Sequence, residues 1–435
     1  MKVALMTLGC KVNSYETEAV WELMKDRGYQ RVDFKEDSDI YIINTCTVTN
    51  NGDSKSRKMI REAVTRNSQG IVIVMGCFSQ LKADEVLAIP GVKIVLGTQN
   101  RALIPDYIDE YRQTKKVVNK VLGLDRHVAF DDLSINAFAN HQRAFLKIQD
   151  GCNNFCSYCI IPYARGRVRS KLPNQVLSEA KTLVENNFKE IILTGIHTGG
   201  YGQDLPNYRF VDLLRDLEAI KGLERIRISS IEISELTDEV ISVISQSHII
   251  VNHLHIPLQS GSDAILQAMN RKYNKQEYAD TITKLRSAIP NLAITTDVIV
   301  GFPGETEADF AEMVAFIRYI NFQELHVFPY SRRSKTVAAT MDNQISGEIK
   351  KARVQILLHL SDELAKAYIK TNINILLQVI PETYHDGMLK GHTANYIYVQ
   401  FPGTVNQIGE LVDIIITKEN YPLSLAKIIT KDAIK

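Results

Sequence analysis

The chain has 435 residues, of which 45% are hydrophobic and 23% charged, so it can form two or three domains with large buried cores. Its net charge of +1 provides no overall attraction to nucleic acid or membrane, and any polyanionic partner must bind a local basic patch. Without a secretory signal or an apolar run of the ~18 residues that span a membrane, we expect a cytoplasmic protein with reduced thiols.

The first part of the chain alternates short apolar runs with amphipathic, helix-like segments. Four runs resemble buried strands: "KVALMTLGC", "DIYIINTC", "GIVIVMGC" and "VKIVLGT". Because short apolar strands separated by helices are typical of a parallel sheet covered on both faces, we predict an open parallel α/β domain over residues 1–112. The more polar residues 113–140 have weaker periodicity and are predicted to be a linker.

Three cysteines follow the first three predicted strands. Cys10, Cys46 and Cys77 each lie at the carboxyl end of a strand, and two of them come directly after a glycine. In an open parallel sheet these ends share one edge, where ligands bind, so thiols far apart in sequence are expected to converge. Three separately buried core thiols are the alternative, since free cysteine is often buried. The repeated placement favours a metal site with three thiolate ligands.

Residues 141–370 contain six strand–helix units in succession. Their strands are "AFLKIQ", "EIILTG", "RIRISS", "HLHIPL", "AITTDVIVG" and "ELHVFPY", which predicts a central partial (β/α)6 barrel with its chemistry at the carboxyl ends of the strands. From residue 371 to 435 the pattern changes to period-two strands separated by Gly, Pro and Asn, which predicts a small antiparallel β-barrel. Such barrels often bind nucleic acid, and a plain interaction domain is the alternative.

A second cysteine triplet follows the first barrel strand. Cys152, Cys156 and Cys159 have the spacing Cys-x3-Cys-x2-Cys, with Tyr158 immediately before the last cysteine. A cubane iron–sulfur cluster normally takes four thiolates and a structural zinc ion takes four ligands, so three thiolates leave one position open. An iron with an open position can bind a cofactor by its amino and carboxylate groups. The tight triplet and the missing secretory signal disfavour a set of disulfides.

Several motifs, in chain order, resemble those of one enzyme family. They are "TLGCKVNSYET", "INTCTVT", "MGCFSQ", "IQDGCNNFCSYCIIPYARG", "LTGIHTGGYG", "RISSIE", "HLHIPLQSGSD" and "TTDVIVGFPGET". From Met1 to about Tyr330 the chain resembles the methylthiotransferase family of radical S-adenosylmethionine (radical SAM) enzymes. Its last segment resembles the RNA-binding TRAM domain of that family through more diffuse motifs. The resemblance implies that the central barrel is a radical SAM domain.

The resemblance also implies two [4Fe–4S] clusters, each bound by three cysteines, and S-adenosylmethionine as cofactor. The cluster at Cys152, Cys156 and Cys159 is expected to bind S-adenosylmethionine. An external electron donor would reduce this cluster, which then splits the cofactor to give a 5′-deoxyadenosyl radical. The cluster at the first triplet is expected to carry the sulfur that is methylated and transferred. A radical fits this task, because no side chain generates one for an unactivated aromatic C–H carbon.

Seven further residues are predicted to surround the cofactor, from the resemblance and from their positions near the strand ends. They are Tyr158, Gly195, Ser230, Glu232, Gln259, Asp297 and Gly301. At Gly195 a Cβ atom would crowd the methionine part of the cofactor. The polar members offer hydrogen bonds to its amino and hydroxyl groups, and Asp297 with the turn that begins at Gly301 would frame the adenine or ribose. A structural role is the alternative for each.

Two basic runs border the expected mouth of the barrel, one after the cysteine loop and one after the sixth strand. The RNA contacts predicted from them are Arg165, Arg167, Arg169, Lys171, Arg332 and Arg333. Charge runs are usually solvated surface, but two runs at one mouth of a nearly neutral protein favour phosphate contacts. Lys335 stands where the family usually has glycine, which argues against a turn with positive φ at this position.

The segment "GCKVN", from Gly9 to Asn13, resembles the branch of the family that modifies threonylcarbamoyladenosine in tRNA. We therefore predict addition of a methylthio group to carbon 2 of N6-threonylcarbamoyladenosine at tRNA position 37. Lys11 and Val12 are expected beside the sulfur carrier, and Arg332 and Arg333 are candidate partners for the substrate carboxylate. The alternatives are isopentenyladenosine in tRNA, an aspartate of a ribosomal protein, and a non-enzymatic iron–sulfur RNA-binding protein. We expect tRNA and an electron donor as partners, and neither membrane nor DNA.

Overall fold

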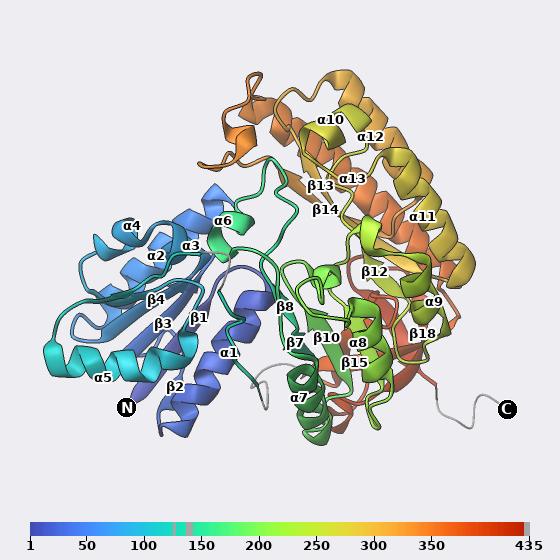
Figure 1. The fold of residues 1–435 in the computed structure, drawn as a ribbon. Coiled ribbons are helices and arrows are strands. Elements are labelled where there is room, and N and C mark those ends of the chain that lie inside the picture. Colours follow the sequence, from blue (N-terminus) through green and yellow to red (C-terminus); the bar gives the residue numbers. More distant parts are fainter. Residues whose placement is uncertain (125–127, 136–141, 430–435) are drawn as a thin grey trace.

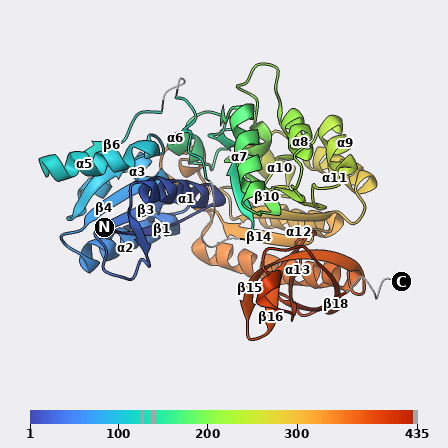
Figure 2. The same ribbon diagram turned by 90° about the horizontal axis from the view of Figure 1, so that it is seen from below.

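A computed structural model describes residues 1–124, 128–135 and 142–429. Figure 1 shows an N-terminal α/β region beside a curved central region. In Figure 2 the C-terminal barrel lies below the central region, next to β14 (Glu324–Pro329) and α13 (Gly347–Thr371). This arrangement confirms the α/β fold class and its three predicted parts. Among the described residues, none of the helices has the length and apolar character needed to cross a membrane.

The described part of the N-terminal region forms one parallel sheet with the strand order β2-β1-β3-β4-β5-β6. Its strands are β1 (Lys2–Thr7), β2 (Gln30–Val32), β3 (Ile40–Thr45), β4 (Ile71–Gly76), β5 (Val92–Leu96) and β6 (Val118–Lys120). Its helices are α1 (Lys11–Asp26), α2 (Asn50–Arg66), α3 (Cys77–Leu81), α4 (Ala83–Leu87) and α5 (Ile104–Thr114).

Burial on both faces explains the continuous apolar strands of this sheet. Every residue of β3 and β4 is buried, and alternate residues belong to different cores, with Ile42 on one face and Tyr41 on the other. The short, partly exposed strands β2 and β6 have too little apolar pattern to be predicted. β6 lies inside the predicted linker, and residues 125–127 and 136–140 of that linker lie outside the described part.

The central region is an open, curved parallel sheet. Two three-stranded sheets, β11-β10-β7 and β12-β13-β14, are joined by a bridge between Ile226 and Ile250, which gives the predicted partial barrel in the described residues. Besides β14, the strands of this sheet are β7 (Ala144–Lys147), β10 (Glu190–Thr194), β11 (Arg225–Ile228), β12 (His253–His255) and β13 (Ala293–Val300). Two further short strands, β8 (Gln149–Asp150) and β9 (Arg169–Ser170), form an antiparallel pair. The helices are α6 (Ile161–Arg165), α7 (Pro173–Glu185), α8 (Phe210–Glu218), α9 (Asp238–Gln246), α10 (Asp263–Ala268), α11 (Lys275–Ala288) and α12 (Glu307–Ile320).

The C-terminal region is a closed barrel with the order β15-β16-β17-β19-β18 in the described residues. Its strands are β15 (Leu376–His385), β16 (Met388–Thr393), β17 (Tyr398–Pro402), β18 (Val412–Lys418) and β19 (Ser424–Ile428). β17 and β19 pair in parallel, so the prediction of a purely antiparallel barrel was wrong at this seam. β16 was not predicted, because small and polar residues such as Gly391 and Thr393 occupy its inward positions.

Helix α1 connects the N-terminal sheet to the central barrel. Its residues Tyr15 and Ala19 belong to the same apolar core as Leu146 of β7, not to a core of the sheet. The Tyr15 hydroxyl also donates to the carboxylate of Glu179 on α7 over 2.8 Å. One end of α1 is therefore fixed against the barrel, and that end begins directly after Cys10.

Candidate active site between two cysteine triplets

The carboxyl edge of the N-terminal sheet carries the first cysteine triplet. Cys10 precedes α1, Cys46 follows β3 directly, and Cys77 is the first residue of α3 after β4. Gly9 has a φ of +108°, and a Cβ atom there would lie 2.9 Å from the Cβ atom of Cys46. The glycine therefore allows the chain of Cys10 to pass close to Cys46. The structure brings these two thiols to one edge, as the strand pattern predicted.

Cys77 is joined to the second cysteine loop by an arginine. The Arg165 Nε donates to the Cys77 Sγ over 3.2 Å, and Arg165 ends α6, the short helix that follows Cys159 and packs against α3. Burial raises the pKa of the Cys77 thiol to about 12. The nearby Arg165 opposes this shift, and a metal bound here would have to displace the thiol proton, because a metal ligand must be a thiolate.

The second triplet lies on the loop between β8 and α6. The backbone N–H of Cys159 donates to the carbonyl of Cys156 over 2.9 Å, and that of Cys152 donates to Gly166 over 3.0 Å. Arg271, in the loop after α10, donates from Nη1 to the Cys156 Sγ over 3.3 Å and pairs with Glu232. This arginine was not recognised in the sequence, where the pair Arg271-Lys272 between two helices carries no distinguishing pattern.

His197 is a second neighbour of the cysteine loop that was not among the residues predicted from the sequence. Its side chain lies between the Cys152 thiol and Glu235, with 2.5 Å between its Nε2 and the carboxylate. Burial alone would lower the pKa of His197, but hydrogen bonds to Cys152 and Glu235 raise it to about 10. His197 therefore places a hydrogen-bonding group beside the second cysteine triplet.

In neither triplet are the three thiols close enough together to surround a single metal ion. All six cysteines are free, and the sulfurs of neither triplet all lie within 4.8 Å of one another. Among the described residues, only His255, Asp297 and His326 place three potential ligand atoms that close together. A cubane cluster, which offers a different iron to each thiolate, suits the wider spacing better than one zinc ion.

A cavity of about 250 Å³ lies between the two triplets. On one side it is lined by Val48 and Thr49, which follow Cys46, and on the other by the second cysteine loop and strands β13 and β14. Three of the predicted cofactor residues line it: Tyr158, Gln259 and Asp297. The lining of the cavity therefore comes from both of the domains that contain a cysteine triplet.

Asp297 is a charged group in the wall of this cavity. Its carboxylate lies 3.3 Å from the His255 Nε2 and 3.2 Å from the His326 Nδ1. Burial alone would raise the pKa of Asp297, but these hydrogen bonds hold it well below its usual range. The backbone of Gln259, held at a φ of +64°, donates its N–H to the Asp297 carbonyl over 2.8 Å. A strained backbone of this kind is typical of ligand-binding sites.

Four other predicted cofactor residues do not line the cavity. A Cβ atom at Gly195 would lie 2.9 Å from the side chain of Gln149, and one at Gly301 would lie 2.3 Å from that of Lys350, so packing within the chain explains both glycines. Glu232 is held by Arg271 beside Cys156, and Ser230 is half-buried after β11. The expected contact of Gly195 with the cofactor stays a prediction.

Most of the predicted RNA contacts are buried, and for these the prediction was wrong. The four buried side chains are Arg165, Arg169, Lys171 and Arg333. Lys171 pairs with Glu179 over 2.5 Å, and Arg333 pairs with Asp53 of α2 over 2.8 Å. Their charges join parts of the protein and cannot reach phosphate. Arg167 and Arg332 are exposed and remain candidates for RNA contacts.

Lys335 adopts the conformation for which the family uses glycine. Its φ is +76°, so the expectation that the turn would lose its positive φ was wrong. The left-handed region costs a non-glycine residue about 1–2 kcal/mol. The buried Arg333 anchors this turn on α2 through Asn50 and Asp53, which holds the strained residue in place.

Lys11 extends from the first residue of α1 towards the barrel. Burial, then the nearby cations Arg143 and Arg227, lower the pKa of Lys11 to about 8, while Glu190 and Asp297 oppose that shift. Its ammonium group makes no hydrogen bond or ion pair within the described residues. Lys11 is therefore a cation next to Cys10 in sequence and near Asp297, without a fixed partner among the described residues.

A buried ionic cluster joins the domains directly behind the site. Glu16 of α1 accepts hydrogen bonds from Lys147 and Arg165, each over 2.7 Å, and also pairs with Arg101. Asp150 shares Lys147 and Arg165 with it. Burial alone would raise the pKa of Glu16, but its three cations hold it well below its usual range. These paired charges thus fix the positions of the two cysteine triplets relative to each other.

Replacing Glu16 by glutamine should destabilise the protein by about 3–5 kcal/mol, because a buried cluster of cations loses its central anion. The matched control is Glu22→Gln on the same helix, where the partner Lys25 is exposed at 3.8 Å and about 0–1 kcal/mol is expected. Denaturant unfolding measures both changes. Equal midpoints for the two variants would show that the buried cluster does not hold the domains together.

Comparison with known proteins agrees with this site. Residues 146–317 match the Radical SAM superfamily, and residues 2–97 match the family described as "Uncharacterized protein family UPF0004". The chain is 51% identical over 426 residues to "Threonylcarbamoyladenosine tRNA methylthiotransferase MtaB" of Bacillus subtilis (strain 168), a match that covers 97% of this chain and 94% of that protein.

The chain is also similar to a relative with a different named substrate and to a solved structure. It is 36% identical over 425 residues to "tRNA-2-methylthio-N(6)-dimethylallyladenosine synthase" of Clostridium botulinum, covering 95% of this chain and 94% of that protein. The fold resembles that of the radical S-adenosylmethionine methyltransferase TsrM of Kitasatospora setae, with a TM-score of 0.60, 13% identity, and 78% and 74% of the two chains covered. The chain belongs to the radical S-adenosylmethionine tRNA methylthiotransferase family, whose radical SAM domain implies a [4Fe–4S] cluster and S-adenosylmethionine.

Proposed function

We propose that this enzyme adds a methylthio group to carbon 2 of N6-threonylcarbamoyladenosine at position 37 of tRNA, and that it binds two [4Fe–4S] clusters. The observation that carries the proposal is the junction of the two cysteine loops. Cys159 of the second triplet lines one cavity together with Val48 and Thr49, which follow Cys46, and Arg165 after the second triplet donates to Cys77 of the first. A single-cluster enzyme would have no use for the first triplet at this edge.

The residues of the chain have distinct tasks in this proposal. Cys10, Cys46 and Cys77 would bind one cluster, and the second triplet would bind the other. When bound, the clusters and S-adenosylmethionine supply the electron, the hydrogen-abstracting radical and the methylated sulfur with which the C2–H bond of adenine is replaced by a C2–S bond. An external donor must provide the electrons. Arg271 and His197 would position the second triplet through their contacts with Cys156 and Cys152.

The cavity between the triplets would hold the reacting groups and exclude water from them. Asp297 and Gln259 offer a carboxylate and an amide at its wall, which suit the hydroxyl and amino groups of the cofactor. Apolar side chains, among them Ile299 and Phe328, complete the lining. Water exclusion matters here because a carbon radical generated at the wrong place would react with whatever group lies nearest.

Lys11 supports threonylcarbamoyladenosine as the substrate. This base carries a carboxylate that the isopentenyl group lacks, and Lys11 is a cation beside Cys10 without a partner among the described residues. Of the two arginines expected to pair with the carboxylate, Arg333 is fixed on Asp53 and is not available, whereas Arg332 is exposed. A site with a buried cation discriminates against an apolar analogue, because that analogue would leave the charge unpaired.

Isopentenyladenosine in tRNA is the second candidate substrate. The relative named as a dimethylallyladenosine synthase is similar over 95% of this chain, but at 36% identity against 51% for the relative named for threonylcarbamoyladenosine. The unpaired Lys11 also favours the charged substrate over the apolar one. Modification of an aspartate in a ribosomal protein is less well supported, because both of these relatives are named for a tRNA substrate.

The two triplets should be separable by mutation. Replacing Cys152, Cys156 and Cys159 by alanine should remove about four irons per chain and abolish reductive cleavage of S-adenosylmethionine. Replacing the other triplet should also remove about four irons but leave cleavage to 5′-deoxyadenosine in place. Iron analysis and chromatography of the cleavage products measure these effects. A protein that lacks the first triplet yet retains full iron and methylthiolates RNA would contradict the two-cluster proposal.

Replacing Lys11 by methionine should lower kcat/KM for threonylcarbamoyladenosine RNA by roughly ten-fold or more, as expected for loss of a contact to a charged group. The matched control substrate is the same RNA with its threonyl carboxylate converted to a methyl ester. On this uncharged substrate the variant and the wild type should have equal kcat/KM. Unchanged iron content and uncoupled cofactor cleavage would show that the neighbouring Cys10 site is intact. An equal loss on both substrates would assign Lys11 a structural role.

A further inference from the structure

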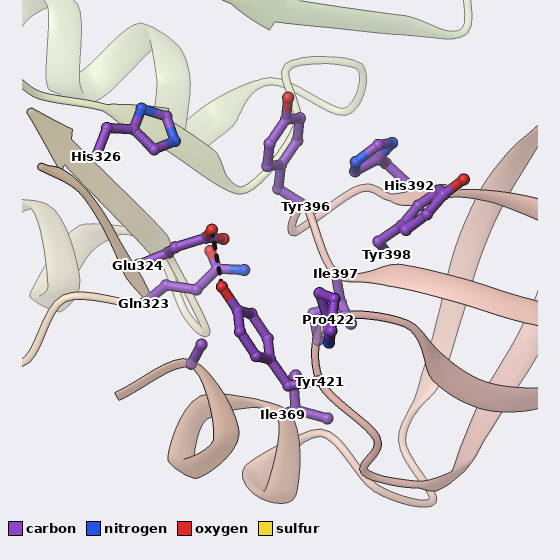
Figure 3. Close-up of a pocket in the computed structure, with 11 residues that line it drawn as sticks. Gln323, Glu324, His326, Ile369, His392, Tyr396, Ile397, Tyr398, Tyr421 and Pro422 are labelled. Carbon is purple, nitrogen blue, oxygen red and sulfur yellow. Dashed lines mark hydrogen bonds between the residues drawn. The ribbon is translucent and has the colours of Figure 1, made fainter. Parts of the chain in front are cut away.

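A second cavity, of about 230 Å³, lies where the C-terminal barrel meets the central barrel. Figure 3 shows its lining residues, which come from β14, from α13 and from the loops and strands of the C-terminal barrel. The prominent side chains are Gln323, His326, His392, Tyr396, Tyr398 and Tyr421. We call this cavity the seam pocket. Aromatic rings are concentrated here to a degree not explained by the methylthiolation site.

The rings on one side of the seam pocket form a continuous stacked column. His253 and Tyr396 stack with centroids 4.5 Å apart, Tyr396 and His392 follow at 4.7 Å, and His392 and Tyr398 at 4.6 Å. The interplanar angles are 15°, 27° and 27°, so the rings are close to parallel. The column ends at the half-buried Tyr398. Parallel aromatic rings at a cavity are the surface on which nucleic-acid bases stack.

The column is fixed in place before any ligand binds. The ring of His392 is hydrogen-bonded through Nδ1 to Glu382 over 2.6 Å, and Arg143 in turn pairs with Glu382 over 3.0 Å. Arg227 lies over the Tyr396 ring at 5.0 Å. Tyr396 itself is held at a φ of +66°, in the left-handed region that residues other than glycine rarely adopt. A rigid platform lowers the entropic cost of binding.

The pocket also contains an unsatisfied polar group. Gln323 is only 5% exposed, and its Oε1 has no hydrogen-bond partner among the described residues. Leaving a buried amide oxygen unpaired is unfavourable, so a ligand with an N–H group would gain a hydrogen bond there. Nucleobases carry such groups on their edges, next to a flat face for stacking.

One residue connects the seam pocket to the cavity between the cysteine triplets. His326 lines the seam pocket and hydrogen-bonds to Asp297, which lines the other cavity. A nucleotide held at the seam pocket is therefore close to the position expected for the reacting adenosine.

We propose that the seam pocket binds an unpaired base of the substrate RNA, a neighbour of the modified adenosine in its loop. This proposal rests on the proposed function for the identity of the substrate. The base would lie against the ring column, with its edge directed at Gln323. The adenine of S-adenosylmethionine has the same chemistry and is the alternative source of the base. Binding here would position the loop so that its neighbour enters the cavity between the triplets.

The test measures binding of an anticodon stem-loop RNA that carries threonylcarbamoyladenosine to the full-length holoenzyme. Tyr398→Ala should weaken binding roughly ten-fold, within the range for stacking of one base on an aromatic ring. Tyr398→Phe, which retains the ring, should bind normally. In the wild type, one abasic substitution beside the modified adenosine should produce the same loss. The Tyr398→Ala variant should bind this abasic RNA and the intact RNA with the same affinity, because the ring on which the missing base would stack is already absent.

Gln323→Met provides a second variant whose folding is not at risk, because the amide oxygen it removes has no partner. It should unfold at the same or higher denaturant concentration and bind the intact RNA several-fold more weakly, since one hydrogen bond contributes about 0.5–1.5 kcal/mol.

Normal RNA binding by Tyr398→Ala would overturn the assignment to an RNA base. So would a loss of affinity in Tyr398→Ala that adds in full to the loss caused by each abasic substitution. A third contrary result is a raised KM for S-adenosylmethionine in uncoupled cleavage with RNA affinity unchanged. The last would assign the pocket to the cofactor adenine. A wild-type enzyme that binds the RNA as expected but leaves it unmodified would contradict the proposed function alone.

Discussion

A buried ionic cluster holds the first two domains together, and the geometry of the site depends on it. Glu16 lies at its centre and accepts contacts from Arg101, Lys147 and Arg165, all of them excluded from solvent. Charges buried in this way are costly unless every one is paired. The set can form only when α1, α6 and β7 adopt one mutual arrangement. In that arrangement Arg165 also reaches Cys77, so the pairing of charges aligns two cysteine triplets from different domains.

This alignment explains why the cavity between the triplets has walls from both domains. Neither domain alone encloses it, since Val48 and Thr49 come from the N-terminal sheet and Gln259 and Asp297 from the barrel. A reaction that needs a radical from one side and sulfur from the other requires such a shared cavity, because the reacting atoms must be within contact distance. The C-terminal barrel contributes to the neighbouring seam pocket. His326, which lines that pocket, hydrogen-bonds to Asp297 in the wall of the cavity between the triplets.

The sequence predicted the fold and the thiols well because both follow from local rules. Buried strands alternating with helices predict a parallel sheet, and its shared edge predicts that Cys10 and Cys46 converge. The sequence did not reveal which basic residues are buried. Arg165 and Glu16 are 149 residues apart, and nothing local distinguishes a paired, buried arginine from an exposed one. Arg271 and His197 were not predicted for the same reason, since their contacts are formed only in the folded protein. The positive φ of Lys335 was not predicted either, because the anchoring of Arg333 imposes it.

The identity of the modified base is tested most directly by mass spectrometry of nucleosides from the tRNA of cells that lack this gene. Loss of 2-methylthio-threonylcarbamoyladenosine is expected, with threonylcarbamoyladenosine accumulating in its place and 2-methylthio-isopentenyladenosine unchanged. Restoring the gene should restore the methylthio group, and a copy without the first cysteine triplet should not. Loss of 2-methylthio-isopentenyladenosine instead, with 2-methylthio-threonylcarbamoyladenosine retained, would contradict the assignment of Lys11 to a substrate carboxylate and with it the proposed substrate.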